Sequence, residues 1–128
     1  MIKLHPTVLA LLLGLSLTLL PAQAQIPQIT LTLAAQTGET YPEFRERAQL
    51  LARQTLERRF QDDPDLSQLR LVIIGYRQGA TAPALAVTLS QRQWRHYQKT
   101  GDLTPYLTDY PDSAALLNFP APPQPNGV

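Results

Sequence analysis

The chain lacks cysteine, and it has few of the other side chains that usually carry chemistry: its 128 residues include two histidines, one tryptophan and one methionine. The absence of thiols excludes disulfides, cysteine nucleophiles and thiolate metal sites. Neither sign of charge is in excess, because the chain has 11 basic and 10 acidic residues. A balanced charge gives no general reason to bind nucleic acid or an anionic membrane. The fold must therefore be held by apolar burial, and the length provides for one domain.

No hydrophobic run in the sequence is long enough to cross a bilayer comfortably. The longest, residues 7–20, has 14 residues and would span about 21 Å as a helix, against a hydrocarbon core of about 30 Å. Lys3 precedes it, Pro21 closes it, and Ala22 and Ala24 stand where a signal peptidase reads. We therefore expect residues 1–24 to be a signal peptide that directs export to the periplasm, the thylakoid lumen or the exterior. A retained membrane anchor is the alternative.

The next segments change from a period of two to a helical period. Apolar and polar residues alternate over residues 28–34, which predicts a half-buried strand. Thr40 and Glu43 have the spacing of a capping box and predict a helix that runs to about Phe60. Its apolar face follows spacings of three and four and comprises Phe44, Ala48, Leu51, Ala52, Thr55 and Leu56.

A β-hairpin is predicted in the middle of the chain. Residues 69–77 form an apolar, β-branched run typical of a central strand, and Gly75 within it indicates a bulge or a close backbone approach. A glycine turn at residues 77–80 leads to a second alternating run at 84–90. Since proline cannot donate a ladder hydrogen bond, we expect the second strand to begin at Pro83 or to lie at a sheet edge.

The C-terminal third is less regular. Ser90 and Gln93 form a second candidate capping box, and Gly101 ends the short helix that they open. Asp112 or Ser113 is expected to cap a last helical turn. Residues 120–128 are rich in proline without periodicity, which predicts an extended, disordered tail.

These elements together predict an α+β fold. The order is strand, long helix, antiparallel hairpin and short helix, with the long helix packed on one face of the sheet. Residues 25–119 form this small single domain, between the signal peptide of residues 1–24 and the tail of residues 120–128. The strand order is not readable from the sequence.

The acidic cluster after the long helix does not have the pattern of a calcium loop. Counted from Asp63, the loop has Asp65 in third place. The sixth place, which needs glycine, is Gln68, and the twelfth, which needs a bidentate acid, is Ile74. Aspartates that end a helix explain the cluster better. Phosphate-loop, dinucleotide, zinc and serine-hydrolase motifs do not occur in the sequence, and we expect no metal and no cofactor.

The candidate ligand site rests on His96 and its neighbours. His96 is the only histidine after the leader, and with Arg92 or Tyr97 it suggests a small hydrolase-like enzyme as an alternative function. Trp94 and Tyr97, three residues apart, share a helix face and indicate either packing or a stacking platform, of which packing is favoured. Arginines that converge near the sheet edge would suit a small anionic ligand, whereas a salt-bridged surface is the alternative. The ligand-binding candidates are Arg77, Arg92, Trp94, Arg95, His96 and Tyr97. The arginines expected near that edge are Arg70, Arg77, Arg92 and Arg95.

From Leu71 the chain reads LVIIGYRQGATAPALAVTLSQRQWRHYQ and later LTPYLTDYPDSAALLNF. This pattern resembles small exported proteins of cyanobacteria, over residues 44–119. The matching positions are Gly75, Gly79, Pro83, Ser90, Gln93, Trp94, Tyr106 or Tyr110, Leu116 and Leu117. The chain departs from the pattern at Gln91, where arginine would directly follow the serine. The resemblance implies a thylakoid-lumen or periplasmic setting and no reaction.

The expected function is therefore a non-catalytic binding or accessory module of the cell envelope. Its partner would be an unidentified envelope protein or a small ligand, with no nucleic acid and no membrane contact beyond the leader. An enzyme is the less favoured hypothesis, since no paired catalytic groups are visible.

Overall fold

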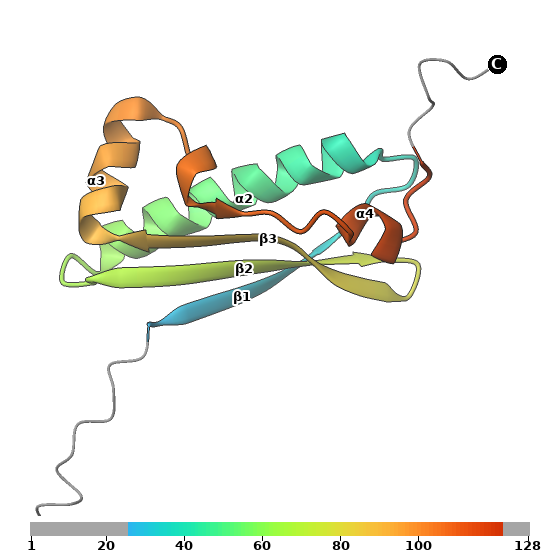
Figure 1. Ribbon diagram of the computed structural model, residues 1–128. Helices are drawn as coiled ribbons and strands as arrows, with labels where there is room; N and C mark the ends of the chain where they lie inside the picture. The colour runs from blue at the N-terminus through green and yellow to red at the C-terminus, as the bar shows by residue number, and fades with distance from the viewer. Residues whose placement is uncertain (1–25, 122–128) are drawn as a thin grey trace, which may run out of the picture.

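A computed structural model describes residues 26–121, in which a four-stranded sheet carries its helices on one face (Figure 1). The predicted α+β class is confirmed. The predicted signal peptide and residues 122–128 of the predicted tail lie outside the described residues. The elements in chain order are β1 (Gln28–Ala34), α2 (Tyr41–Asp62), β2 (Gln68–Arg77), β3 (Ala80–Ser90), α3 (Gln91–Thr100), a 3₁₀ turn (Thr104–Tyr106), β4 (Leu107–Thr108) and α4 (Ser113–Leu116).

The strands lie in the order β1-β2-β3-β4. β1 and β2 are parallel, with α2 as the crossover between them, whereas β2 and β3 form the predicted antiparallel hairpin. β4 is only two residues long and pairs with Ala86 and Val87 of β3. β1 thus forms one edge of the sheet over its full length. At the opposite edge, β4 pairs with β3 over only two residues.

The long helix α2 begins where the sequence indicates. The Thr40 hydroxyl accepts a hydrogen bond from the backbone N–H of Glu43 and donates one to the Glu43 carboxylate, at 3.3 and 2.9 Å. Proline is tolerated in the first turn because its missing N–H has no helical partner there. The buried side chains recur every four residues and are Phe44, Ala48, Ala52, Leu56 and Phe60.

The hairpin differs from its prediction at one end. Its two-residue turn places both Gln78 and Gly79 at positive φ, 52° and 82°, as this turn requires. β3 begins at Ala80, so the expectation that the strand starts at Pro83 is wrong. The other alternative holds: within residues 26–121, β4 pairs only with Ala86 and Val87, so β3 is an edge strand at Pro83 and the missing N–H costs no bond on that side. The register shifts beside Pro83 and leaves Ala84 without a partner in β2.

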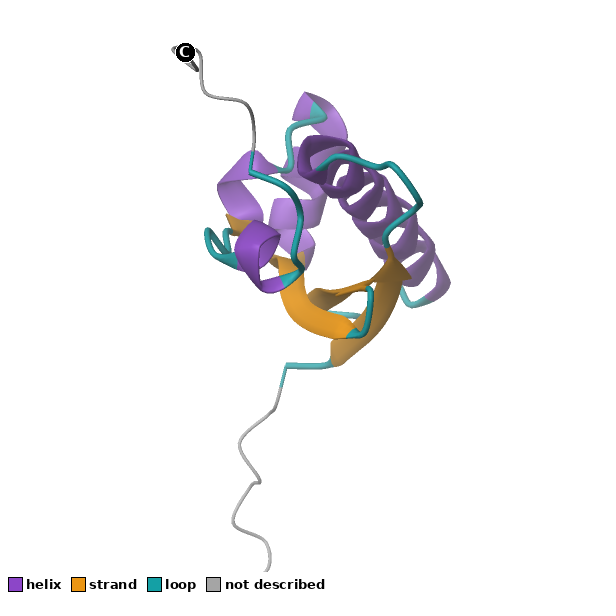
Figure 2. Ribbon diagram, turned by 90° about the vertical axis from the view of Figure 1, so that its right-hand side faces the viewer, coloured by secondary structure: helices purple, strands orange, loops and turns teal. Residues whose placement is uncertain are grey.

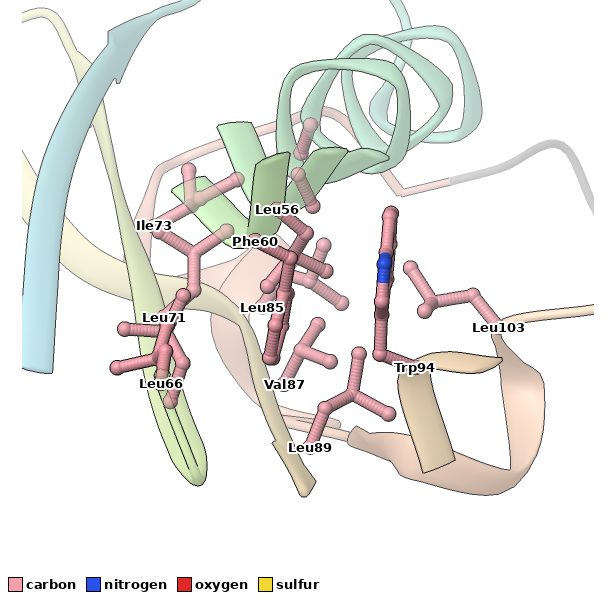
Figure 3. Close-up of a cluster of buried hydrophobic side chains, with 13 residues drawn as sticks. Leu56, Phe60, Leu66, Leu71, Ile73, Leu85, Val87, Leu89, Trp94 and Leu103 are labelled. Carbon is pink, nitrogen blue, oxygen red and sulfur yellow. The ribbon is translucent and has the colours of Figure 1, made fainter. Parts of the chain in front are cut away.

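Two apolar clusters hold the helices on the sheet. Figure 3 shows the first, where α2, the sheet and α3 meet and Phe60 stacks on Trp94 with ring centroids 5.0 Å apart. The second joins α2 and β3 to the C-terminal segment and consists of Phe44, Ala82, Ala84, Leu117 and Phe119. Gly75 lies against it so closely that a Cβ there would stand 2.7 Å from Leu117 Cδ1 and 3.0 Å from Phe44 Cζ. The expected close approach is therefore confirmed.

The short helix α3 has both predicted ends. Ser90 and Gln93 form the complete capping box, with side-chain to backbone distances of 3.1 and 2.9 Å. Gly101 ends the helix in the left-handed conformation, at φ 71°. At α4, Asp112 stands in the capping position but its side chain makes no capping hydrogen bond.

Candidate functional site

The structure does not bring the six predicted ligand residues together. Arg77 ends β2 beside the hairpin turn, whereas α3 begins beyond Ser90, which pairs with Gln68 at the other end of the strand. The two ends of this ten-residue strand are nine residue steps apart, roughly 30 Å at 3.3 Å per step. The Arg77 guanidinium donates to the backbone carbonyls of Leu117 and Asn118 and lies over the Phe119 ring. Arg77 therefore fastens the C-terminal segment to the sheet.

The remaining five candidates lie on α3 but do not share one face for a ligand. Trp94 is only 6% exposed, with one ring face against Phe60, and Tyr97 is tilted against it at 5.4 Å. Arg92 and Arg95 are exposed. Trp94 and Tyr97 line a shallow hollow of about 280 Å³ between α2 and α3, together with Arg53, Glu57, Gln98 and Gly101. Packing accounts for most of the surface of the tryptophan.

His96 has no catalytic surroundings in the part of the chain that the structure describes. Its side chain is exposed, and it makes no hydrogen bond or ion pair with any residue of 26–121. It lines none of the three hollows found on this part of the surface. A general base needs a partner that orients it and a pocket that holds substrate. The geometry gives the hydrolase hypothesis no support.

A more substantial feature lies along the free margin of the sheet. A groove of about 400 Å³ runs between β1 and α2. Ile29 and Leu31 of β1 and Leu51 of α2 form its apolar floor, and all three are only half-buried. The other lining residues come from the second half of α2 and are Gln54, Thr55, Arg58, Arg59 and Asp62. Figure 2, turned by 90° from Figure 1, shows the sheet on one side and the helices gathered on the other.

The backbone of β1 presents alternate residues to this margin. The carbonyl of Pro27 accepts from Arg70 N, and Ala35 N donates to Tyr76 O, so odd-numbered residues direct their polar backbone groups towards β2. Because strand residues alternate, the N–H and C=O groups of the even-numbered residues point outwards. These residues are Gln28, Thr30, Thr32 and Ala34.

The C-terminal end of β1 is closed by an ion pair between a buried carboxylate and a half-buried guanidinium. The Arg47 guanidinium contacts both carboxylate oxygens of Glu39, at 2.6 and 2.8 Å, and also donates to the Ala34 carbonyl at 2.8 Å. The side chain of Glu39 is only 4% exposed. The hydrogen bonds from Arg47 hold the pKa of the Glu39 carboxyl below its usual value, against the effect of burial. The edge thus ends at Ala34, and the groups of Gln28, Thr30 and Thr32 remain unoccupied by residues 26–121.

Charge is distributed unevenly along this margin. α2 runs back against β1, so Arg58, Arg59 and Asp62 lie beside the Ile29 end of the groove and give it a net charge of +1. At the other end a second hollow is lined by Glu39, Glu43, Glu46, Arg47, Gln36 and Leu50. Since Glu39 is paired with Arg47, Glu43 and Glu46 make this end acidic. Neither Arg58 nor Arg59 forms an ion pair within residues 26–121.

The sequence analysis does not identify this margin as a site, although the composition of β1 indicates an unprotected edge. The strand QITLTLA carries no charge and no proline, the devices by which proteins usually protect a sheet edge. The strand was predicted, but its edge position depends on the parallel pairing with β2, which no local pattern specifies.

Two other site classes are not seen in residues 26–121. No three histidine, aspartate or glutamate side chains are grouped so as to hold a metal ion. Within the same residues, no helix has the length and apolar character needed to cross a membrane.

The chain was also compared with known proteins. Models of protein families, curated proteins and solved structures all give no match to it. The resemblance to cyanobacterial exported proteins therefore stays a prediction.

Proposed function

We propose that this protein is a non-catalytic binding module of the cell envelope that holds an extended polypeptide along the open edge of β1. The observation that carries the proposal is the combination at one margin of an apolar groove and an uncharged strand edge to which no other strand of residues 26–121 pairs. A strand edge offers main-chain hydrogen bonds to any extended segment, and the adjacent groove selects its side chains.

We expect such a segment to lie antiparallel or parallel to β1 in the plane of the sheet. Its backbone would bond to the outward groups of Gln28, Thr30 and Thr32. Successive side chains of a strand point to opposite faces, so every second side chain of the bound segment would enter the groove. The half-buried Ile29 and Leu31 favour apolar side chains there. We therefore expect the bound segment to alternate between apolar and polar residues.

The envelope setting is proposed on the leader alone. The order of basic start, apolar run and small residues in residues 1–24 favours export. A retained anchor would leave the same domain at a membrane surface, and the mass of the purified natural protein distinguishes the two, because cleavage gives a chain that starts near Gln25.

Site-specific photocrosslinking tests the binding edge. A photoreactive amino acid replaces Gln54, which lines the groove, and in a second strain replaces Arg95, which is exposed on α3. We expect a covalent adduct with a polypeptide from position 54 and none from position 95. The absence of a polypeptide adduct at position 54, or equal adducts at both positions, would contradict the proposal.

A further inference from the structure

We infer that the polypeptide held by this edge is β1 of a second copy of the chain, paired antiparallel about a twofold axis at Leu31. The inference rests on the proposed function and names the partner of that same edge. Two features of the margin are consistent with it: the register, which matches both the backbone groups and the side chains beside them, and the charge at the two ends.

The backbone groups match when the axis passes through Leu31. Thr30 then lies opposite Thr32 of the second copy, and Gln28 opposite Ala34 of the second copy. All four residues direct their N–H and C=O groups outwards. Opposed residues of this kind exchange both hydrogen bonds in an antiparallel ladder. The two Thr30–Thr32 pairs can therefore exchange both hydrogen bonds, whereas the Ala34 carbonyl is already bound by Arg47 and only the Ala34 N–H is left to bond with Gln28.

The side chains match in the same register. On the groove face Leu31 meets Leu31 of the second copy, and Ile29 meets Leu33. These three side chains are half-buried and pack against the first apolar cluster. Leu31 forms a non-hydrogen-bonded pair, the kind in which opposed side chains come closest. On the other face threonine lies opposite threonine, which is a favourable cross-strand pair. Pairing would therefore join the first apolar cluster of one copy to the first apolar cluster of the other.

The charges also match, because antiparallel pairing reverses the margin. The basic end of one copy, at Arg58 and Arg59, comes level with the acidic end of the other, at Glu43 and Glu46. Parallel pairing would instead place the two basic ends side by side and the two acidic ends side by side. Opposite charge across an interface favours the correct arrangement and disfavours others.

A twofold pairing of this edge would not propagate into fibres. A twofold axis uses the same surface on both copies, so the pairing closes at two and leaves no further edge of β1. Another occupant, such as residues 122–128 or an unrelated protein, would not be related to β1 by a twofold axis. The experiments below separate them from a second copy.

Disulfide trapping tests the register, since the sequence has no other cysteine. At a non-hydrogen-bonded antiparallel pair the Cα atoms are about 4.5 Å apart, within the range of a disulfide. Leu31→Cys should therefore give a covalent dimer under mild oxidation. Ile29→Cys is the matched control, because Ile29 faces Leu33 of the second copy. An equal mixture of Ile29→Cys and Leu33→Cys should again give the dimer. Equal trapping of Leu31→Cys and Ile29→Cys alone would overturn the register.

Proline at an outward position tests the pairing without disturbing the sheet. Thr32→Pro removes an N–H that points away from β2, and Thr32→Ala, which keeps this N–H, is the control. All 128 residues are expressed, and the protein is purified in the form that the host produces, with the leader either cleaved or retained. Sedimentation should show twice the chain mass for the native protein and for Thr32→Ala. Thr32→Pro loses a donor on each side of the axis, which should raise the dimer Kd at least about tenfold.

The outcomes distinguish this inference from the proposed function. A native protein that stays monomeric at every concentration overturns self-pairing. If position 54 then crosslinks to a different polypeptide, the binding module stands with another partner. If it crosslinks to no polypeptide, both proposals fail. A crosslink between two identical chains, lost in Thr32→Pro and kept in Thr32→Ala, supports both.

Discussion

Replacing Gly75 with alanine places one methyl group in the second apolar cluster, where there is no room for it. The new Cβ would stand 2.7 Å from Leu117 Cδ1 and 3.0 Å from Phe44 Cζ, whereas ordinary contact begins at 3.4 Å. Both neighbours are fully buried, so neither can move into solvent. Overpacking of this kind costs about 1–3 kcal/mol, and removing glycine from a strand returns about 0.5–1 kcal/mol. We expect a net loss of about 1–2 kcal/mol in the free energy of unfolding.

A double-mutant cycle isolates the cause. Leu117→Ala alone leaves a cavity and should cost about 2–5 kcal/mol. In the double variant the alanine at position 75 takes part of the vacated space, so its own cost should fall to zero or change sign. Urea unfolding of the four proteins measures this coupling. Leu103→Ala, in the first cluster, is the control and should add to Gly75→Ala within about 0.5 kcal/mol. Additivity with Leu117→Ala would refute the steric explanation.

Three further predictions concern the ion pair, the cap of α3 and the aromatic stack. Glu39→Gln should destabilise the fold at pH 7 by about 1–2 kcal/mol, because it leaves the half-buried Arg47 without its carboxylate. Since folding lowers the pKa of Glu39, its contribution is present above the unfolded pKa near 4.5 and is lost as pH falls through the folded pKa; unfolding curves from pH 7 to 3 should be flatter for Glu39→Gln, and parallel curves would contradict the prediction. Ser90→Ala removes the hydroxyl that caps Gln93 N and should cost about 1 kcal/mol in urea unfolding, whereas Ser90→Asp should cost less. Trp94→Ala should cost about 3–5 kcal/mol, measured in the same way, and a cost below 1 kcal/mol would show that the stack on α2 is not formed.

Local patterns were sufficient for most of the fold. The alternation of QITLTLA, the cap at Thr40, the capping box at Ser90 and the glycine at 101 each act within a few residues, and each has the predicted effect. β4 was missed because Leu107 and Thr108 form a strand only by pairing with Ala86 and Val87. Such a strand has no periodicity of its own.

The site was less predictable for the same reason. The five candidates of α3 are neighbours in the sequence, and the structure keeps them on one helix. Arg77 could share a ligand site with them only if the two ends of β2 lay close together, but these ends lie at opposite ends of the sheet. The groove depends on β1 lying outermost, which follows from the parallel crossover through α2. Residue types at single positions do not carry this information.

The parallel pairing of β1 also sets an order of assembly. β2 and β3 meet across a two-residue turn, so the hairpin closes locally and fast. Gln28, by contrast, pairs with Arg70 beyond the whole of α2, and closing so long a loop is slow. The strand that leaves the ribosome first is therefore the last to join the sheet. Substitutions in β1 should speed unfolding and leave the folding rate nearly unchanged, whereas substitutions in the hairpin should slow folding.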